Sequence, residues 1–353
     1  MVSWTRGGEF PRNGKELTIE QDMARLYIHP KFKDLADRYR FVDLGLRLVE
    51  MATIRTLWLV SRAIGIDRAS DLGAVFGGVV GRRLRKNKHV MRNLKIVFPD
   101  RDQGWIEETA HKTWRQIGRV LAEYPHIDEL CRMGEGARVT LVSEGPLEDI
   151  RNAPVGMVFL AMHQANWNLP ALAGALGNFP LDVIFAEQKH SAFEAMIASH
   201  RNRMPCGFIH VRDVPRKMIA ALRQGRGVGL FVDHRIDGGD PVPFFGHDAQ
   251  TTTIPARIAC KLGTGVVPTR IERLDGAHFR LTLGRPVYPD PDIAGDHEAA
   301  HSLMCKVHER FEEWVRARPE DWCCVKRRWS SSISKPARRG IAAGMDKPPE
   351  IVV

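Results

Sequence analysis

From about residue 139 onward, short apolar runs alternate with segments whose apolar residues recur every three or four positions. The runs are typical of buried parallel strands, and the spaced pattern is typical of helices that cover a sheet. The alternation predicts an α/β fold with a mostly parallel central sheet flanked by helices, and an antiparallel strand pair late in the chain. We expect strands at residues 139–142, 155–161, 181–185, 208–210, 227–232, 266–272 and 279–283, and helices at 169–176, 192–204, 214–223, 254–262 and 298–317.

The N-terminal part has a different pattern. Residues 41–66 carry apolar residues at helical spacing, but charged residues interrupt them. This segment is too charged to span a bilayer, yet it is amphipathic enough to lie on a membrane or to pack on a core. One more helix is expected near residues 17–40. The chain thus divides into a polar arm at 1–40, a helical membrane-associating region at 41–130, an α/β domain at 131–330 and a disordered basic tail at 331–353.

The chain has 353 residues and a formal net charge of +10. This excess of positive charge indicates an anionic partner, which can be nucleic acid, a phospholipid surface or an acidic carrier protein. Between Gly81 and Pro99 the sequence holds seven Lys or Arg residues and no acidic one. The interleaved aromatic residues that stack on bases are missing from this stretch, so we expect an anionic membrane surface rather than nucleic acid.

The six cysteines are scattered and form no CxxC pair. This argues against a disulfide framework or a zinc ribbon and suits a reducing compartment. The N-terminus has no apolar core after its charged residues, so no secretory signal is predicted. No stretch reaches the roughly 18 apolar residues of a spanning helix, which leaves peripheral attachment to a membrane open.

Polar residues follow two of the predicted strands directly. The apolar run at 155–162 ends at His163, and the run at 227–232 ends at Asp233. Parallel strands end at the same edge of a sheet, where open α/β folds bind their ligands. A histidine beside a carboxylate there can act as a general base with an orienting acid. The alternative is a histidine that only bonds the backbone of a turn.

Further residues near these strand ends are candidates for substrate binding. Arg235 follows Asp233, and Arg201 lies on a predicted helix after the loop that contains Glu187. Both arginines suit an anionic substrate. Phe244 and Phe245 fall in a Gly- and Pro-rich segment that we expect to be an irregular loop, where exposed aromatic residues would line a pocket or touch a membrane.

A zinc-protease pattern, HExxH, occurs at His297 and His301. The third ligand of such a site is not evident, because His308 follows without the glycine turn of the extended motif. We interpret the pattern as a solvated helical face and expect no metal.

Four motifs, NLKIVFP, HQANW, DHR with PFFGHDAQTTTIPARIA, and RPEDWCCVKRRW, occur in this order between residues 44 and 329. Together they resemble the late, lauroyl/myristoyl-type acyltransferases of lipid A biosynthesis. These belong to the lysophospholipid acyltransferases, which also include phosphatidylinositol mannoside acyltransferases. The resemblance implies an α/β enzyme on the cytoplasmic face of the cell inner membrane. It also implies an acyl thioester of acyl carrier protein or coenzyme A as donor, without a cofactor, and a glycolipid as acceptor.

The resemblance assigns the removal of a proton from the acceptor hydroxyl to His163. In the family an Asp or Glu stands five residues after this histidine, whereas this chain has Asn168, which we expect to cap the following helix and to orient the loop. Either Asp233 or Glu187 then supplies the negative charge, or acyl transfer is lost and the protein only binds lipid. We favour the first, with Asp233 as the partner. A second departure is Lys326, where the family tends to have His.

Overall fold

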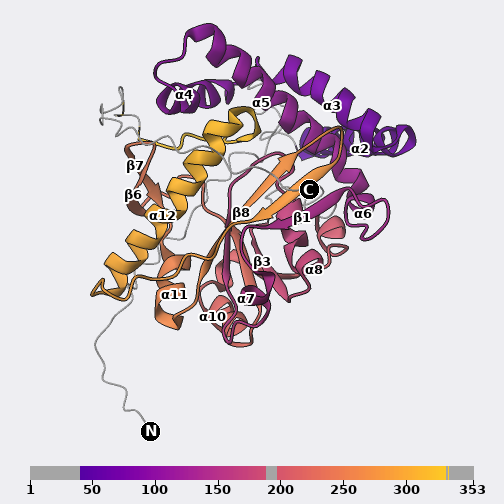
Figure 1. The fold of residues 1–353 in the computed structure, drawn as a ribbon. Helices are drawn as coiled ribbons and strands as arrows, with labels where there is room; N and C mark the ends of the chain where they lie inside the picture. The colour runs from indigo at the N-terminus through magenta and orange to yellow at the C-terminus, as the bar shows by residue number, and fades with distance from the viewer. Residues whose placement is uncertain (1–39, 188–196, 331–332, 334–353) are drawn as a thin grey trace, which may run out of the picture.

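The computed structural model describes residues 40–187, 197–330 and 333 (Figure 1). The predicted arm at 1–40 and the helix predicted near 17–40 lie outside these residues except for Arg40. Most of the tail and residues 192–196 of the helix predicted at 192–204 also lie outside them. The division into four regions remains a prediction.

A seven-stranded sheet with the order β1-β9-β8-β2-β5-β3-β4 forms the centre of the fold (Figure 1). Every neighbouring pair is parallel except β8 and β9, which are antiparallel. This confirms the predicted mostly parallel sheet with one late antiparallel pair. Its strands are β1 (Val139–Ser143), β2 (Val158–Ala161), β3 (Leu181–Phe185), β4 (Gly207–His210), β5 (Gly227–Phe231), β8 (Val266–Arg273) and β9 (Phe279–Leu283).

Helices cover both faces of the sheet. All four residues of β2 are buried, and they alternate between two apolar cores: Val158 and Leu160 belong to one, Phe159 to the other. The first core lies under α10 (Arg216–Arg223), α11 (Ile254–Leu262) and α12 (Asp296–Ala317). The second lies under α6 (Ile127–Leu130), α7 (Leu147–Arg151), the 3₁₀ turn η2 (Leu169–Leu172) and α8 (Ala173–Gly177). A strand that is buried on both faces needs a continuous apolar run, which is why β2 was recognisable from the sequence.

The helices α2 (Arg40–Ile64), α3 (Ile66–Gly81), α4 (Asn87–Val97) and α5 (Gln103–Glu123) lie across one end of the sheet (Figure 1). The predicted helix at 41–66 is divided at Gly65, whose φ of 80° a helix does not allow. Small residues bring α3 and α5 close together, since a Cβ on Gly118 would lie 2.0 Å from the carbonyl oxygen of Gly73. None of the helices in the described residues is both long and apolar enough to cross a bilayer.

The segment expected to be an irregular loop is a β-hairpin, so that prediction was wrong. Strand β6 (Asp240–Phe244) pairs antiparallel with β7 (His247–Thr251). The prolines are tolerated because a two-stranded hairpin has open edges. Phe245 and Gly246 form the turn, with φ of 52° and 74°, and positive φ at both turn residues matches the twist of the two strands.

The expectation of exposed aromatic residues in this segment was also wrong. Phe244 is 1% exposed and Phe245 is 8% exposed. Both rings contact Trp329, with centroid distances of 5.7 and 6.5 Å. The hairpin therefore closes the apolar core on the α12 side and offers neither ring to a lipid.

Candidate active site

His163 and Asp233 meet at the carboxyl edge of the sheet. His163 stands two residues after β2, and Asp233 stands two residues after the neighbouring parallel strand β5. The Nδ1 atom of His163 lies 2.7 Å from Oδ1 of Asp233, and the backbone N–H of His163 donates to Oδ2 at 3.1 Å. The contact between His163 and Asp233 that we expected from their positions after two parallel strands is therefore present.

Trp322, from the segment after α12, completes the surroundings of Asp233. Its indole Nε1–H donates to Oδ2 of the carboxylate at 3.1 Å, and its side chain is buried. Two backbone bonds hold this segment to the loop after β2: the N–H of Cys323 donates to the carbonyl of His163, and the N–H of Ala165 donates to the carbonyl of Asp321. Trp322 lies within one of the recognised motifs, but no local pattern in the sequence places it beside Asp233.

The environment of Asp233 keeps its carboxyl group ionised. The side chain is 1% exposed, and burial alone would raise its pKa. The charge interaction with His163 and the hydrogen bonds from that residue outweigh burial and hold the pKa well below its ordinary value. When His163 is neutral, the ionised carboxylate accepts its Nδ1–H, and the lone pair of the ring is then on Nε2. Nε2 can then accept a proton from a substrate.

His234 packs flat on His163. The two ring centroids are 4.2 Å apart and the ring planes differ by 11°. Burial, followed by the charge of His163, lowers the pKa of His234 to about 3, so its ring is neutral at neutral pH. His163, Asp233 and His234 also place one potential metal ligand each within 4.8 Å of one another. The in-plane lone pairs of two nearly parallel rings do not converge on one ion, which disfavours that interpretation.

Asn168 does not act as the predicted helix cap. Its backbone is helical and its side chain makes no capping hydrogen bond to the 3₁₀ turn η2 that follows. Instead its Oδ1 accepts from the hydroxyl of Tyr124 at 2.9 Å, and its Nδ2 donates to Asn166 at 3.0 Å. Asn166 in turn donates to Glu123 at 2.8 Å. Asn168 therefore connects the loop after β2 to the end of α5.

Glu123 is a fully buried residue that sequence reasoning missed. Its carboxylate pairs with both Nη atoms of Arg273, at 2.5 and 3.0 Å, and accepts from Ser70 at 2.6 Å. A single acid at the end of an amphipathic helix looks solvent-exposed in the sequence. Its partner follows 150 residues later, so only the fold brings the pair together.

The predicted arginines and Glu187 lie near the same edge of the sheet. The guanidinium carbon of Arg201 is 4.0 Å from the ring centroid of Phe185, the last residue of β3, which neighbours β5. Arg235 pairs with Asp237 at 2.6 Å. Glu187 is exposed, two residues beyond β3, and the hydrogen bond of His163 goes to Asp233.

The HExxH residues form no metal-binding group with a third residue in the described part of the chain. The Nε2 atom of His301 lies 3.1 Å from the carbonyl oxygen of Pro241, on β6.

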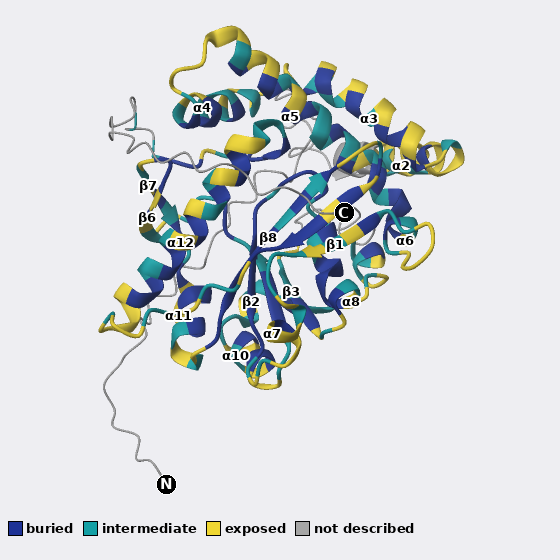
Figure 2. Cartoon of the chain, viewed as in Figure 1, coloured by how far each residue is buried: buried dark blue, intermediate teal, exposed yellow. Residues whose placement is uncertain are grey.

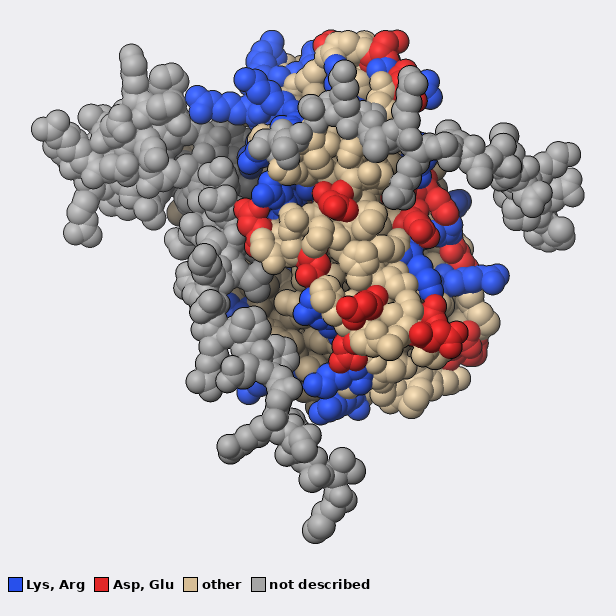
Figure 3. Space-filling view, turned by 90° about the vertical axis from the view of Figure 1, so that its left-hand side faces the viewer, with Lys and Arg blue, Asp and Glu red and all other residues tan. Residues whose placement is uncertain are grey.

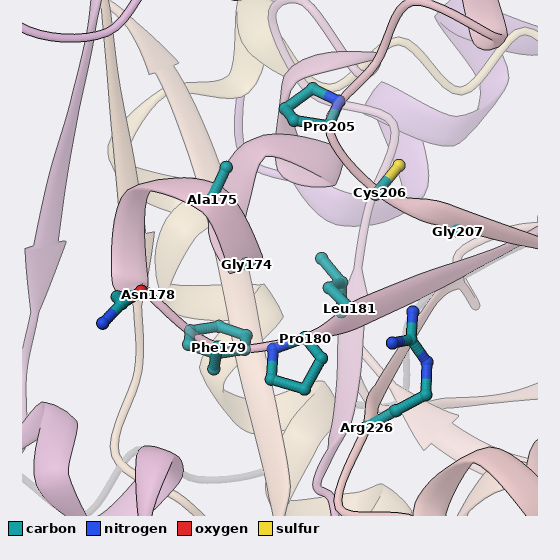
Figure 4. Close-up of a pocket in the computed structure, with 10 residues that line it drawn as sticks. All are labelled: Gly174, Ala175, Asn178, Phe179, Pro180, Leu181, Pro205, Cys206, Gly207 and Arg226. Atoms are coloured by element: carbon teal, nitrogen blue, oxygen red, sulfur yellow. The ribbon is translucent and has the colours of Figure 1, made fainter.

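A cavity of about 470 Å³ lies at the opposite edge of the sheet, where β3, β4 and β5 begin (Figure 4). Arg226 lines it, but its guanidinium is already bonded to both oxygens of Asp182, at 2.9 and 2.5 Å. Because this cavity is at the amino end of the strands, it is separate from the His163 site.

Residues 46–331 match the family of bacterial lipid A biosynthesis acyltransferases. Two curated relatives are phosphatidylinositol mannoside acyltransferases from two strains of Mycobacterium tuberculosis. Each is 25% identical over 229 residues, which are 64% of this chain and 65% of the relative. The chain thus matches just under two thirds of the length of these relatives. A solved structure, the 1-acyl-sn-glycerophosphate acyltransferase of Thermotoga maritima, aligns with a TM-score of 0.35 and 19% identity, covering 71% of this chain and 98% of that one.

Proposed function

Because the chain belongs to the bacterial lipid A biosynthesis acyltransferase family, we propose that it moves a fatty acyl chain from an acyl thioester to a hydroxyl of a lipid A precursor or a related glycolipid. The observation that carries this proposal is the hydrogen bond between His163 and the buried, ionised Asp233 at the carboxyl edge of the sheet. Glycolipid here includes phosphatidylinositol mannosides, since that is the acceptor in the names of the curated relatives.

The geometry of this pair supports the following reaction. Nε2 of His163 takes the proton of the acceptor hydroxyl while the oxygen of this hydroxyl attacks the carbonyl carbon of the thioester. The C–O bond forms, the C–S bond breaks, and the leaving thiolate takes the proton back from the imidazolium. Asp233 holds the Nδ1–H and stabilises the positive charge that His163 carries between these two proton transfers. The donor is the thioester of acyl carrier protein or coenzyme A, and no step needs a cofactor.

Arg201 and Arg235 bind the anionic groups of the substrates in this proposal. The placement of Arg201 on Phe185 supports its role, because β3 ends at the same edge as β2 and β5. A planar guanidinium can hold a phosphate through two hydrogen bonds.

We place the protein on the cytoplasmic face of the inner membrane, with α2 and α3 against the lipid. Figure 2 shows exposed positions along both helices, and many of these positions carry apolar side chains. Together they form a larger apolar surface than single exposed residues would. Exposed basic residues on and before α4 suit anionic headgroups, and Figure 3 shows Lys and Arg gathered along the upper part of one face. The exposed apolar residues are Leu48, Val49, Leu57, Leu59 and Val60 on α2, and Leu72, Val75, Phe76 and Val79 on α3; the exposed basic ones are Arg82, Arg83, Arg85, Lys88 and Lys95.

One aromatic side chain links this membrane face to the site. Trp58 of α2 stacks on Tyr124 at 6.5 Å and meets the ring of His200 edge-on at 4.7 Å. Tyr124 bonds Asn168 in the loop that carries His163. These contacts support an approach of the lipid along α2 to the edge of the sheet where the proposed base lies.

The test is acyl transfer by the purified protein with each combination of acyl carrier protein or coenzyme A thioester and lipid A precursor or phosphatidylinositol mannoside, followed by mass spectrometry of the lipids. We expect His163→Ala to abolish transfer, while His278→Gln, which changes an exposed histidine, leaves it intact. A wild-type protein that binds these lipids but transfers no acyl chain would instead be a lipid-binding homologue.

A further inference from the structure

We propose that His234 is a positioning residue that fixes the ring of His163 in the orientation needed to accept the hydroxyl proton. This inference rests on the proposed acyl transfer. It starts from the stacking of the two rings, 4.2 Å apart and within 11° of parallel.

A single hydrogen bond does not fix an imidazole. The bond from Nδ1 to Asp233 holds one corner of the ring, but the ring can still tilt about that bond, and a tilt swings Nε2 through an arc. Contact across the face of the ring removes this freedom. His234 provides the nearly parallel contact, and Phe231 adds a second at 4.5 Å and 31°. A base whose ring is already fixed in the reactive orientation does not lose conformational freedom when the substrate binds, and such pre-organisation raises the reaction rate by a large factor.

The backbone of His234 is itself anchored. Its carbonyl oxygen accepts from Nη1 of Arg328, whose side chain is fully buried. The same guanidinium donates to the carbonyl of Gln250 at 3.0 Å and to Oγ1 of Thr251 at 2.6 Å. Arg328 thus connects the residues after β5 to strand β7, through a long hydrogen bond of 3.4 Å on the His234 side. This connection restrains the backbone that carries the ring of His234.

The electrostatics suit a supporting ring rather than a second base. The ionisable groups around His234 are His163, Asp233, Lys326 and Arg328. Burial and three of these neighbours disfavour its protonation, so His234 does not compete for the proton of the acceptor. A neutral aromatic ring also attracts the imidazolium that His163 becomes during the reaction, whereas a second cation would repel it.

The experiment compares wild type, His234→Ala and His234→Phe by steady-state kinetics and by the downfield proton resonance of the His163 Nδ1–H, with thermal unfolding to confirm that each variant is folded. A misplacement of about 1 Å costs on the order of 100-fold in rate. We therefore expect His234→Ala to lower kcat about 10- to 100-fold, with KM for both substrates within about twofold of wild type, and to broaden the Nδ1–H resonance. The Phe variant keeps a flat ring, so its kcat and the sharpness of its Nδ1–H resonance should be close to those of wild type.

Two results overturn the inference: a folded Ala variant with wild-type kcat and a sharp resonance, or a Phe variant as impaired as the Ala variant. The first means that the stack does not position His163, and the second means that the nitrogens of His234 matter instead. If the wild-type protein transfers no acyl chain, the proposed function fails, and the resonance of His163 still shows whether His234 orders its ring.

Discussion

The substitution Asp233→Asn tests the proposed chemistry most directly, because it keeps the shape of the side chain and removes its charge. Asp233 accepts three N–H groups: Nδ1–H and the backbone N–H of His163, and Nε1–H of Trp322. An amide has one oxygen and one NH₂ group. If the oxygen stays with the backbone and indole donors, the NH₂ group faces Nδ1 of His163 and donates to it. His163 then carries its proton on Nε2, the atom that should receive the hydroxyl proton.

The expected loss is large. The same exchange in a Ser-His-Asp hydrolase lowers kcat by about 10⁴ for this reason, which corresponds to about 5.5 kcal/mol of activation free energy. We expect a similar fall in kcat here, with KM nearly unchanged because the carboxylate is buried and does not reach the substrate. The free energy of unfolding should also fall, since the lowered pKa of Asp233 means that the folded state stabilises its carboxylate more than water does.

The assay is acyl transfer under saturating donor and acceptor, alongside thermal unfolding of each variant. Asp248→Asn is the matched control, because Asp248 is an exposed acid on strand β7. A folded Asp233→Asn protein that keeps more than about a tenth of wild-type kcat would refute the assignment of Asp233 as the partner of His163.

Three stability predictions follow from buried contacts. Gly118→Ala puts a Cβ 2.0 Å from the carbonyl oxygen of Gly73, so α3 and α5 must separate; we expect a loss of about 1–3 kcal/mol in urea unfolding, and an unchanged midpoint would contradict it. Glu123→Gln leaves the charge of Arg273 unpaired in the core and should cost about 3–5 kcal/mol, where a cost below about 1 kcal/mol would be inconsistent with a buried pair. Burial raises the pKa of Asp321 to about 7. The folded state then binds its proton more tightly than the unfolded chain, and stability falls as pH rises from about 4 to 7, by roughly 4 kcal/mol in total. Asp321→Asn should remove this fall. The measurement is the free energy of unfolding of wild type minus that of the variant, which should be smaller at pH 8 than at pH 5.

The sequence by itself determined the class of fold and the central feature of the site. Buried parallel strands must be apolar on both faces, so β2 and β5 were visible as apolar runs. Polar residues that directly follow such strands lie at one edge of the sheet, which is why His163 and Asp233 could be paired before their contact was known. The ordered motifs also indicated the family, and the match over residues 46–331 confirms it.

Only the tertiary structure decided how the pair is supported. Trp322 reaches Asp233 from 89 residues away, and Glu123 meets Arg273 across 150; periodicity describes neighbours along the chain and carries no information on such contacts. The burial of Phe244 was missed for a related reason. Glycine and proline signal a turn, but whether the flanking residues face water or a core depends on what the rest of the chain places against them.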